Sequence, residues 1–164
     1  MQDKLRWINE IMDEHGDYLK RTAAIITSDT SLAEDLVQET FLNLYRNSNS
    51  FRREAKVRTY LYRILMNNIK MHYRKSKPKE CAFEIERAGS VSFENETVDA
   101  MDINNAVSKL KPIYRQIVVL HYFDGMSIDE ISEVMDIGNS AVKMRLKRAR
   151  EQLRRHLLEG RDTV

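Results

Sequence analysis

The sequence predicts an all-α fold with two small helical domains joined by a flexible linker, the C-terminal domain containing a helix-turn-helix. Apolar residues recur at helical spacing behind helix-capping motifs along most of the 164 residues. No segment alternates apolar and polar residues as a half-buried strand would. The acidic stretch over 77–98 has no sustained period, which indicates a linker between domains at 1–76 and 99–164.

Three helices are expected in the N-terminal domain, over about 2–26, 31–45 and 57–75. A Ser-x-x-Glu motif from Ser31 to Glu34 is a capping box and predicts the start of the second helix. The third helix is expected to end before Pro78, because proline disfavours helical backbone in the residue that precedes it. The apolar stripe of the third helix is expected to contain Val57, Leu61, Ile64 and Met71.

The C-terminal domain is expected to hold helices over about 98–110 and 112–122, followed by two more joined by a tight turn. A second capping box, Ser127 to Glu130, starts the first helix of that pair. Gly138 is expected to supply the positive φ that a sharp turn needs. The final helix starts at about residue 139 or 140, and its buried stripe is expected to be Val142, Leu146, Ala149 and Leu153.

The outward face of the final helix predicts a DNA-binding surface. Seven Lys or Arg residues lie between positions 143 and 155, against the single acid Glu151. Such a second helix after a short turn is typical of a helix-turn-helix whose recognition helix enters the major groove. The alternative is a surface helical hairpin with a solvated basic face. The capping box, the short glycine-containing turn and the clustering of cations on the second helix together favour DNA binding over it. The expected contacts are Ser140, Lys143, Met144, Arg145, Lys147, Arg148 and Arg150.

The helix over 57–75 and the loop before it predict a second nucleic-acid site, suited to a single strand. Cations can follow phosphates, an aromatic ring can stack on a base and an amide can contact a base edge. The expected residues are Phe51, Arg52, Arg53, Lys56, Arg58, Tyr60, Arg63, Asn67, Lys70 and Arg74. The alternative is an amphipathic helix in which Tyr60 and Phe51 belong to the core.

Charge is strongly segregated along the chain, although the net charge is only +2. Residues 1–50 carry −4, residues 51–79 carry +9, residues 80–105 carry −6 and residues 106–164 carry +3. This alternation indicates two polyanion-facing surfaces separated by an acidic segment. Asp35, Gln38, Glu39 and Leu42 lie close to one side of the second helix, which suggests a protein-docking face or, alternatively, a solvated acidic face.

Neither an enzymatic activity nor secretion of the protein is expected. The four histidines lack metal-ligand spacing, and neither a phosphate-binding nor a dinucleotide-binding glycine motif is present. We therefore expect no catalytic residue, no metal, no cofactor and no small-molecule substrate. The single Cys81 excludes an internal disulfide and fits a reducing compartment, and the first residues do not form a signal peptide. These features predict a cytoplasmic protein.

Three segments carry a resemblance to a known family: AEDLVQETFLNLYRN at 33–47, SFRREAKVRTYLYRILMNN at 50–68, and the stretch from LKPIYRQ at 110 to KRAR at 150. They resemble the extracytoplasmic-function (group IV) sigma factors of bacterial RNA polymerase. The resemblance implies that the N-terminal domain is the second conserved sigma region and the C-terminal domain the fourth. It also implies an alternative sigma factor, often for stress responses, that binds core polymerase, recognises −35 and −10 promoter elements and directs initiation.

The resemblance also assigns roles to residues and names partners. Asp35, Gln38, Glu39 and Phe41 match the motif that docks on the clamp helices of the largest polymerase subunit. The 51–56 loop, Tyr60, Arg63 and Asn67 match the part that opens the −10 element, and Lys143, Met144, Lys147 and Arg148 match the −35 reader. Further implied partners are the flap of the second-largest subunit, promoter DNA and an anti-sigma factor, which in many members is membrane-anchored.

The chain departs from the family pattern at four positions, which leaves the promoter sequence open. Tyr60 stands where tryptophan is usual, and Val57 where phenylalanine is usual. Arg53 replaces a frequent glycine, and Met144 a frequent small polar residue.

The linker length agrees with a promoter-reading role. About 20 residues span at most roughly 70 Å. Two DNA sites one and a half to two helical turns apart need roughly 50–70 Å. The alternative function is a helix-turn-helix transcriptional regulator with a helical sensor domain, which accounts for the C-terminal domain but not for the basic aromatic strip over 51–75.

Overall fold

The computed structural model describes residues 1–51, 56–76 and 98–162, except for the side chains of 98–100 and 161–162. Within those residues the elements are all helices, joined by short turns, with no strand, as the sequence predicts. Arg52, Arg53 and most of the expected linker, including Cys81, lie outside the described residues. The elements are α1 (Gln2–Thr27), α2 (Thr30–Asn47), α3 (Val57–Ser76), α4 (Val98–Ser108), α5 (Pro112–Val118), a π-helical turn η1 (Val119–Phe123), α6 (Ile128–Met135) and α7 (Asn139–Asp162).

The start of α2 differs from the predicted capping box. Asp29 is the N-cap residue, and its Oδ1 accepts a hydrogen bond from the backbone N–H of Leu32 at 3.0 Å. Ser28 before it adopts the left-handed conformation, with φ 54°, and ends α1. The prediction that Ser31 starts the helix was therefore wrong by about half a turn. Asp29 is an equally good cap, and it occupies the first extended position after the α1 terminus.

The buried face of α3 also differs from the predicted stripe. Met71 is 53% exposed, whereas Leu61 is buried as expected. At 100° per residue, Met71 lies about 150° around the helix from the centre of the observed buried face. The apolar residues of that face are Leu61, Tyr62, Leu65, Met66 and Ile69, and Thr59 is buried as well.

The second capping box forms as predicted. The backbone N–H of Glu130 donates to Ser127 Oγ at 3.1 Å, and the backbone N–H of Ser127 donates to Glu130 Oε2 at 2.9 Å. The turn after α6 is closed differently from expectation, because Asp136 and not Gly138 takes the positive φ, at 53°. Aspartate tolerates the left-handed region better than most residues, and the Asp136 N–H satisfies the carbonyl of Ser132 there.

The π-helical turn places one acidic side chain on the inner side of the C-terminal half. The backbone N–H of Asp124 donates to the carbonyl of Val119 at 3.0 Å, five residues back, which widens the end of the helix. Gly125 follows with φ 65°, a conformation that glycine adopts without strain. This reversal directs the Asp124 carboxylate toward α1.

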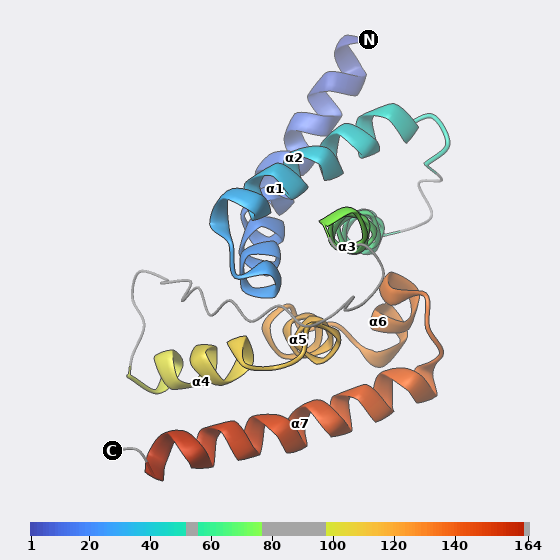
Figure 1. Ribbon diagram of the computed structural model, residues 1–164. Coiled ribbons are helices and arrows are strands. Elements are labelled where there is room, and N and C mark those ends of the chain that lie inside the picture. Colours follow the sequence, from blue (N-terminus) through green and yellow to red (C-terminus); the bar gives the residue numbers. More distant parts are fainter. Residues whose placement is uncertain (52–55, 77–97, 163–164) are drawn as a thin grey trace.

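The two helical units pack directly against each other. Buried side chains form one continuous cluster from Ile8 in α1 to Ala149 in α7. Figure 1 shows α5 and α6 between the N-terminal helices and α7, which lies along the far side of the C-terminal unit. The interface is formed by α1 and α3 on one side and by α5, η1 and α6 on the other.

Candidate nucleic-acid interface

The recognition face of α7 is arranged as the sequence predicts. Val142, Leu146 and Ala149 are fully or almost fully buried and fix the rotation of the helix. Arg145 is half-buried. The remaining expected DNA-contacting residues are exposed on the outer side, namely Ser140, Lys143, Met144, Lys147, Arg148 and Arg150.

Two side-chain contacts fix the recognition helix to the rest of its unit. At its start, Asn139 Nδ2 donates to Asp129 Oδ1 of α6 at 2.6 Å. Farther along, Arg150 Nη1 donates to the Tyr122 hydroxyl at 3.1 Å. Arg150 thus leans toward η1, on the flank of the exposed face, whereas Arg148 points outward on the face itself. The geometry gives a basic helix with a defined orientation and an unobstructed outer surface.

The basic strip on α3 is exposed over most of its length. Arg63, Asn67, Lys70 and Arg74 are exposed along one side of the helix. Tyr60, at the start of the strip, is half-buried and stacks against Phe51, with ring centroids 5.0 Å apart. Phe51 in turn lies 6.0 Å from the ring of Trp7 in α1.

The sequence left open whether Phe51 and Tyr60 contact nucleic acid or belong to the core. The aromatic cluster of Trp7, Phe51 and Tyr60 has features of both. The rings support the start of α3 and remain partly accessible. Sequence analysis did not single out Trp7. The only signal for it was that it is the single tryptophan of the chain, within an amphipathic helix.

Lys56 and Arg58, expected on the same nucleic-acid surface, face the C-terminal unit instead. Arg58 Nη2 donates to the backbone carbonyl of Asp124, and its guanidinium lies 5.7 Å from the centre of the Tyr62 ring. Lys56 Nζ lies 3.6 Å from Glu130 Oε1 of α6. Arg58 is thus engaged by the C-terminal unit, whereas the side chain of Lys56 remains 79% exposed beside its contact with Glu130.

The expected docking surface lies on α2 and is mixed acidic and apolar. Asp35, Gln38 and Glu39 are exposed, and Leu42 beside them is 48% exposed. Phe41 is different, because its side chain is only 5% exposed and packs in the core. In this structure Phe41 supports the helix from beneath and does not form part of its outer surface.

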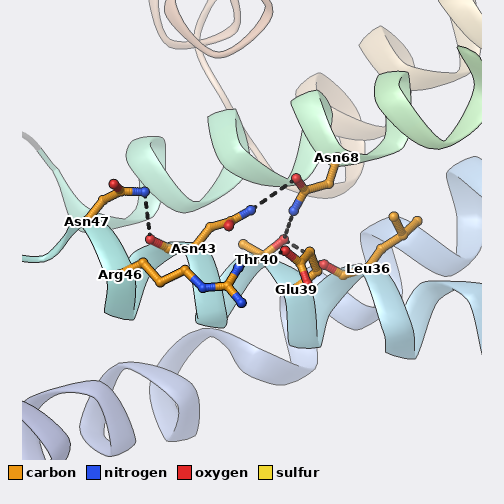
Figure 2. A network of polar contacts seen from close by, with 7 residues as sticks. All are labelled: Leu36, Glu39, Thr40, Asn43, Arg46, Asn47 and Asn68. Atoms are coloured by element: carbon orange, nitrogen blue, oxygen red, sulfur yellow. Dashed lines mark hydrogen bonds and ion pairs between the residues drawn. The ribbon is translucent and has the colours of Figure 1, made fainter.

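A polar network fastens α2 to α3 directly behind this surface, as Figure 2 shows. Asn68 Nδ2 donates to Thr40 Oγ1 at 3.2 Å, and Thr40 Oγ1 donates to the carbonyl of Leu36 at 2.7 Å. Asn43 Nδ2 donates to Asn68 Oδ1 at 3.3 Å. Asn68 is the neighbour of Asn67 in sequence. The network therefore fixes the position of the acidic face of α2 relative to the basic strip of α3.

The interface between the two units contains buried polar groups that sequence analysis did not find. The hydroxyl of Thr22 in α1 donates to the Asp124 carboxylate, with Oγ1 at 2.8 Å from Oδ2 and 3.0 Å from Oδ1. Burial raises the pKa of Asp124, although its hydrogen bonds and the nearby cations act in the opposite direction. Burial also raises the pKa of Tyr62 to about 12, and the charge of Asp124 adds to that shift.

Arg115 of α5 is a second buried contact across the interface. It is 6% exposed, and its Nη1 donates to the carbonyl of Ile26 near the end of α1 at 2.9 Å. Its Nη2 donates to the carbonyls of Ser108 at 2.6 Å and Leu110 at 2.9 Å. A cation at the end of a helix stabilises the unpaired carbonyls there. The signal in the sequence was an arginine two residues before the apolar run 117–120.

No group of His, Cys, Asp and Glu among the described residues could hold a metal ion. Within the same residues, no helix is both long and apolar enough to cross a membrane.

Comparison with known proteins identifies both halves. Residues 11–78 match the family Sigma-70 region 2, and residues 100–153 match the family Sigma-70, region 4. The ECF RNA polymerase sigma factor SigW of Bacillus subtilis (strain 168) is 31% identical, covering 90% of this chain and 87% of its own length. SigM of the same strain, also an ECF RNA polymerase sigma factor, is 30% identical, covering 90% of this chain and 93% of its own.

Solved structures share the fold. The sigma factor RpoE from Bartonella quintana, solved with the anti-sigma factor NepR, is similar with a TM-score of 0.73 and 23% identity, covering 91% of this chain and 95% of that chain. CnrH, solved with the cytosolic domain of CnrY, has a TM-score of 0.72 and 25% identity, covering 95% and 90%. Because two conserved regions match in order and relatives of at least 30% identity span nine-tenths of its length, the chain belongs to the extracytoplasmic-function sigma factors, which direct promoter recognition in transcription initiation.

Proposed function

We propose that this sigma factor uses three separate surfaces to join RNA polymerase to a promoter. The acidic face of α2, with Asp35, Gln38 and Glu39, docks on the clamp helices of the largest subunit. The basic strip of α3 captures the opened −10 strand, and the outer face of α7 reads the −35 element as duplex. The domain limits that we propose are 1–76, 77–98 and 99–164.

The observation that carries this proposal is the outer face of α7. Six residues that the sequence assigns to DNA contact are exposed there, while the buried stripe holds the helix in place. An exposed, basic, rigidly mounted helix fits the major groove, where Arg and Lys contact guanine and phosphates. Asn67 and the three cations of the α3 strip are exposed as well, which supports binding of a second, single-stranded target.

Two further parts of the proposal concern partners and location. We place the protein in the bacterial cytoplasm, because polymerase and promoter DNA are its proposed partners. An anti-sigma factor, soluble or membrane-anchored, is the proposed inhibitor, and the complex in which CnrH was solved supports a protein partner. The function requires no catalytic step, metal or cofactor, since each surface acts by binding alone.

Run-off transcription with purified core polymerase on a genomic DNA library tests the proposal. A sigma factor should direct specific transcripts only when core polymerase is present, and it should bind promoter duplex weakly alone. A helix-turn-helix regulator would instead shift duplex DNA tightly by itself and give no transcript with core polymerase. The second result would replace the proposed function with that alternative.

A further inference from the structure

Met144 is an apolar side chain at the centre of a basic surface. It is 50% exposed, although the residues around it on the outer face of α7 are charged or polar. At about 100° per residue, Met144 lies about 170° around the helix from the centre of the buried stripe of Val142, Leu146 and Ala149. Of the residues expected to contact the −35 element, it faces most directly away from the core.

The position of Met144 is fixed by contacts on both sides of it. Asn139, at the start of α7, donates a hydrogen bond to Asp129 of α6. Arg150, farther along the helix, donates a hydrogen bond to the Tyr122 hydroxyl. Met144 lies between these two contacts, on a helix whose buried stripe sets its rotation. The backbone is therefore held in one orientation, with the Met144 side chain directed outward.

The side chain of Met144 has no group suited to a strong hydrogen bond with a base edge. Its thioether is only a weak acceptor, whereas adenine, guanine and cytosine present hydrogen-bond donors and acceptors in the major groove. Thymine also presents an apolar feature there, its 5-methyl group. A long, unbranched and polarisable side chain fits such a methyl group, because their contact removes apolar surface from water on both molecules.

We propose that Met144 is a specificity-determining residue that reads the 5-methyl group of a thymine in the −35 element. This inference rests on the proposed function and deepens it, because it names the base that one residue of the α7 face recognises. Lys143, Lys147 and Arg148 are exposed around Met144 and attract phosphates and guanine through charge. Met144 carries no charge, so it adds selectivity to that surface without adding salt-dependent affinity.

The neighbouring Arg148 locates this thymine within the promoter. The two residues are four positions apart on one helix, so they are separated by about 6 Å along the helix axis. Successive base pairs of DNA are about 3.4 Å apart. The thymine that Met144 reads should therefore lie within about two base pairs of the guanine that Arg148 is expected to contact, on either strand.

Uracil lacks only the 5-methyl group of thymine, so replacing thymine by uracil tests this contact one position at a time. The probes are promoter fragments recovered by run-off transcription, each with one thymine of the −35 element replaced on either strand. Burial of one methyl group corresponds to roughly a fourfold change in affinity. Holoenzyme with the parent chain should therefore lose affinity roughly three- to fivefold at one thymine and keep its affinity at the others.

Variants at Met144 assign the uracil effect to this side chain. Met144→Ala should bind the thymine and uracil fragments equally, with an unchanged dependence of affinity on salt concentration. Met144→Leu retains an apolar side chain and should preserve the preference for thymine. Met101→Ala is the matched control, because Met101 is a similarly exposed methionine, at 59%, on α4 of the same unit. It should respond to uracil like the parent, and circular dichroism should show unchanged helix content in all three variants.

The outcomes separate this contact from the proposed function. A parent holoenzyme that binds promoter fragments but is indifferent to every uracil would overturn the role of Met144 and leave the proposed function intact. The same loss at uracil in the parent and in Met144→Ala would also overturn it, because another residue would then read the methyl group. A chain that binds duplex DNA tightly without core polymerase would refute the proposed function, and the uracil series on that duplex would still decide the role of Met144. A parent that binds no DNA in either form would overturn both.

Discussion

The role of an arginine in this protein depends on whether its guanidinium group is buried or exposed. Arg115 is buried and bonds carbonyls at Ile26, Ser108 and Leu110, so it stabilises the fold. Arg148 is exposed on the recognition face and is available to DNA. Helical spacing predicted the exposure of Arg148 from its position relative to the buried stripe of α7. The partners of Arg115 could not be predicted in the same way, because one of them lies 89 residues away in the sequence.

Replacing Arg148 by alanine should relax base preference at one position of the −35 element. An arginine that makes two hydrogen bonds to one guanine supplies roughly 1–3 kcal/mol of discrimination against other bases. Arg150→Ala is the matched control, because Arg150 bonds Tyr122 on the flank and should contribute only salt-dependent affinity for any sequence. Binding of holoenzyme to promoter fragments with single-base changes would measure both. Equal losses on every fragment for Arg148→Ala would remove that residue from base readout.

Tyr62 should make the protein sensitive to alkaline pH. Its pKa is raised to about 12, first by burial and then by the charge of Asp124, while an unfolded tyrosine ionises near 10. The folded state thus favours the neutral phenol, and this contribution to stability is complete below pH 10 and is lost as the pH rises toward 12. By linkage the loss is about 1.4 kcal/mol by pH 11.

Urea unfolding at pH 9 and pH 11 measures this effect. Tyr62→Phe should lose about 1.4 kcal/mol less than the parent between those two pH values. Tyr18→Phe is the control, since it removes a phenol from a side chain that is 60% exposed. The same pH dependence in Tyr62→Phe and in the parent would show that another group is responsible.

The helices themselves were largely predictable, but some of their ends and faces were not. Helical periodicity and the Ser127 capping box predicted the start of α6 and the orientation of α7. The ends at Asp29 and Asp136 were missed because several polar residues nearby could cap equally well, and packing decided between them. The exposed position of Met71 shows the same limit, because its neighbours Leu65 and Ile69 determine which face of α3 is buried.

The acidic face of α2 should be necessary for polymerase binding. Asp35→Lys combined with Glu39→Lys reverses the charge of that face and should abolish binding to core polymerase. The fold should survive, because both side chains are exposed and the ion pair of Glu39 with Arg46, at 3.3 Å, contributes at most about 1 kcal/mol. A pull-down with core polymerase and circular dichroism would measure both effects.

The control for this charge reversal changes two acidic residues with the same spacing on another helix. Asp13→Lys combined with Asp17→Lys changes two exposed acids of α1, also four residues apart. That variant should bind core polymerase like the parent. Normal binding by the folded α2 variant would exclude this face as the docking site.

The arrangement of the two units could not be predicted from the sequence. The contacts that hold it join Thr22 to Asp124, Ile26 to Arg115 and Lys56 to Glu130, each between residues far apart in the chain. Periodicity describes one helix at a time and contains no information about such pairs. The family resemblance predicted both units and their functional faces, but not the polar contacts between them.

Tyr60 and Asn67 should matter for promoter opening and not for binding of the closed duplex. Promoter opening needs both units of the protein together with the polymerase. A flipped base costs a few kcal/mol to unstack, and stacking on an aromatic ring returns roughly 1–3 kcal/mol. Holoenzyme with Tyr60→Ala or Asn67→Ala should therefore bind promoter DNA but show weak permanganate reactivity at thymines of the −10 element. Asn67 is exposed, so its replacement should not disturb the fold.

Two controls distinguish an effect on DNA strand opening from an effect on the fold of the protein. Tyr60 also stacks on Phe51, so Tyr60→Phe keeps that packing and should open promoters nearly as well as the parent. A pre-melted template should restore part of the transcription lost by Tyr60→Ala, because the strands no longer have to be separated. The restoration should be smaller for Asn67→Ala if its amide also reads the captured base, as proposed for this strip. If both alanine variants open duplex promoters like the parent, the strip on α3 supports the fold and another surface melts the DNA.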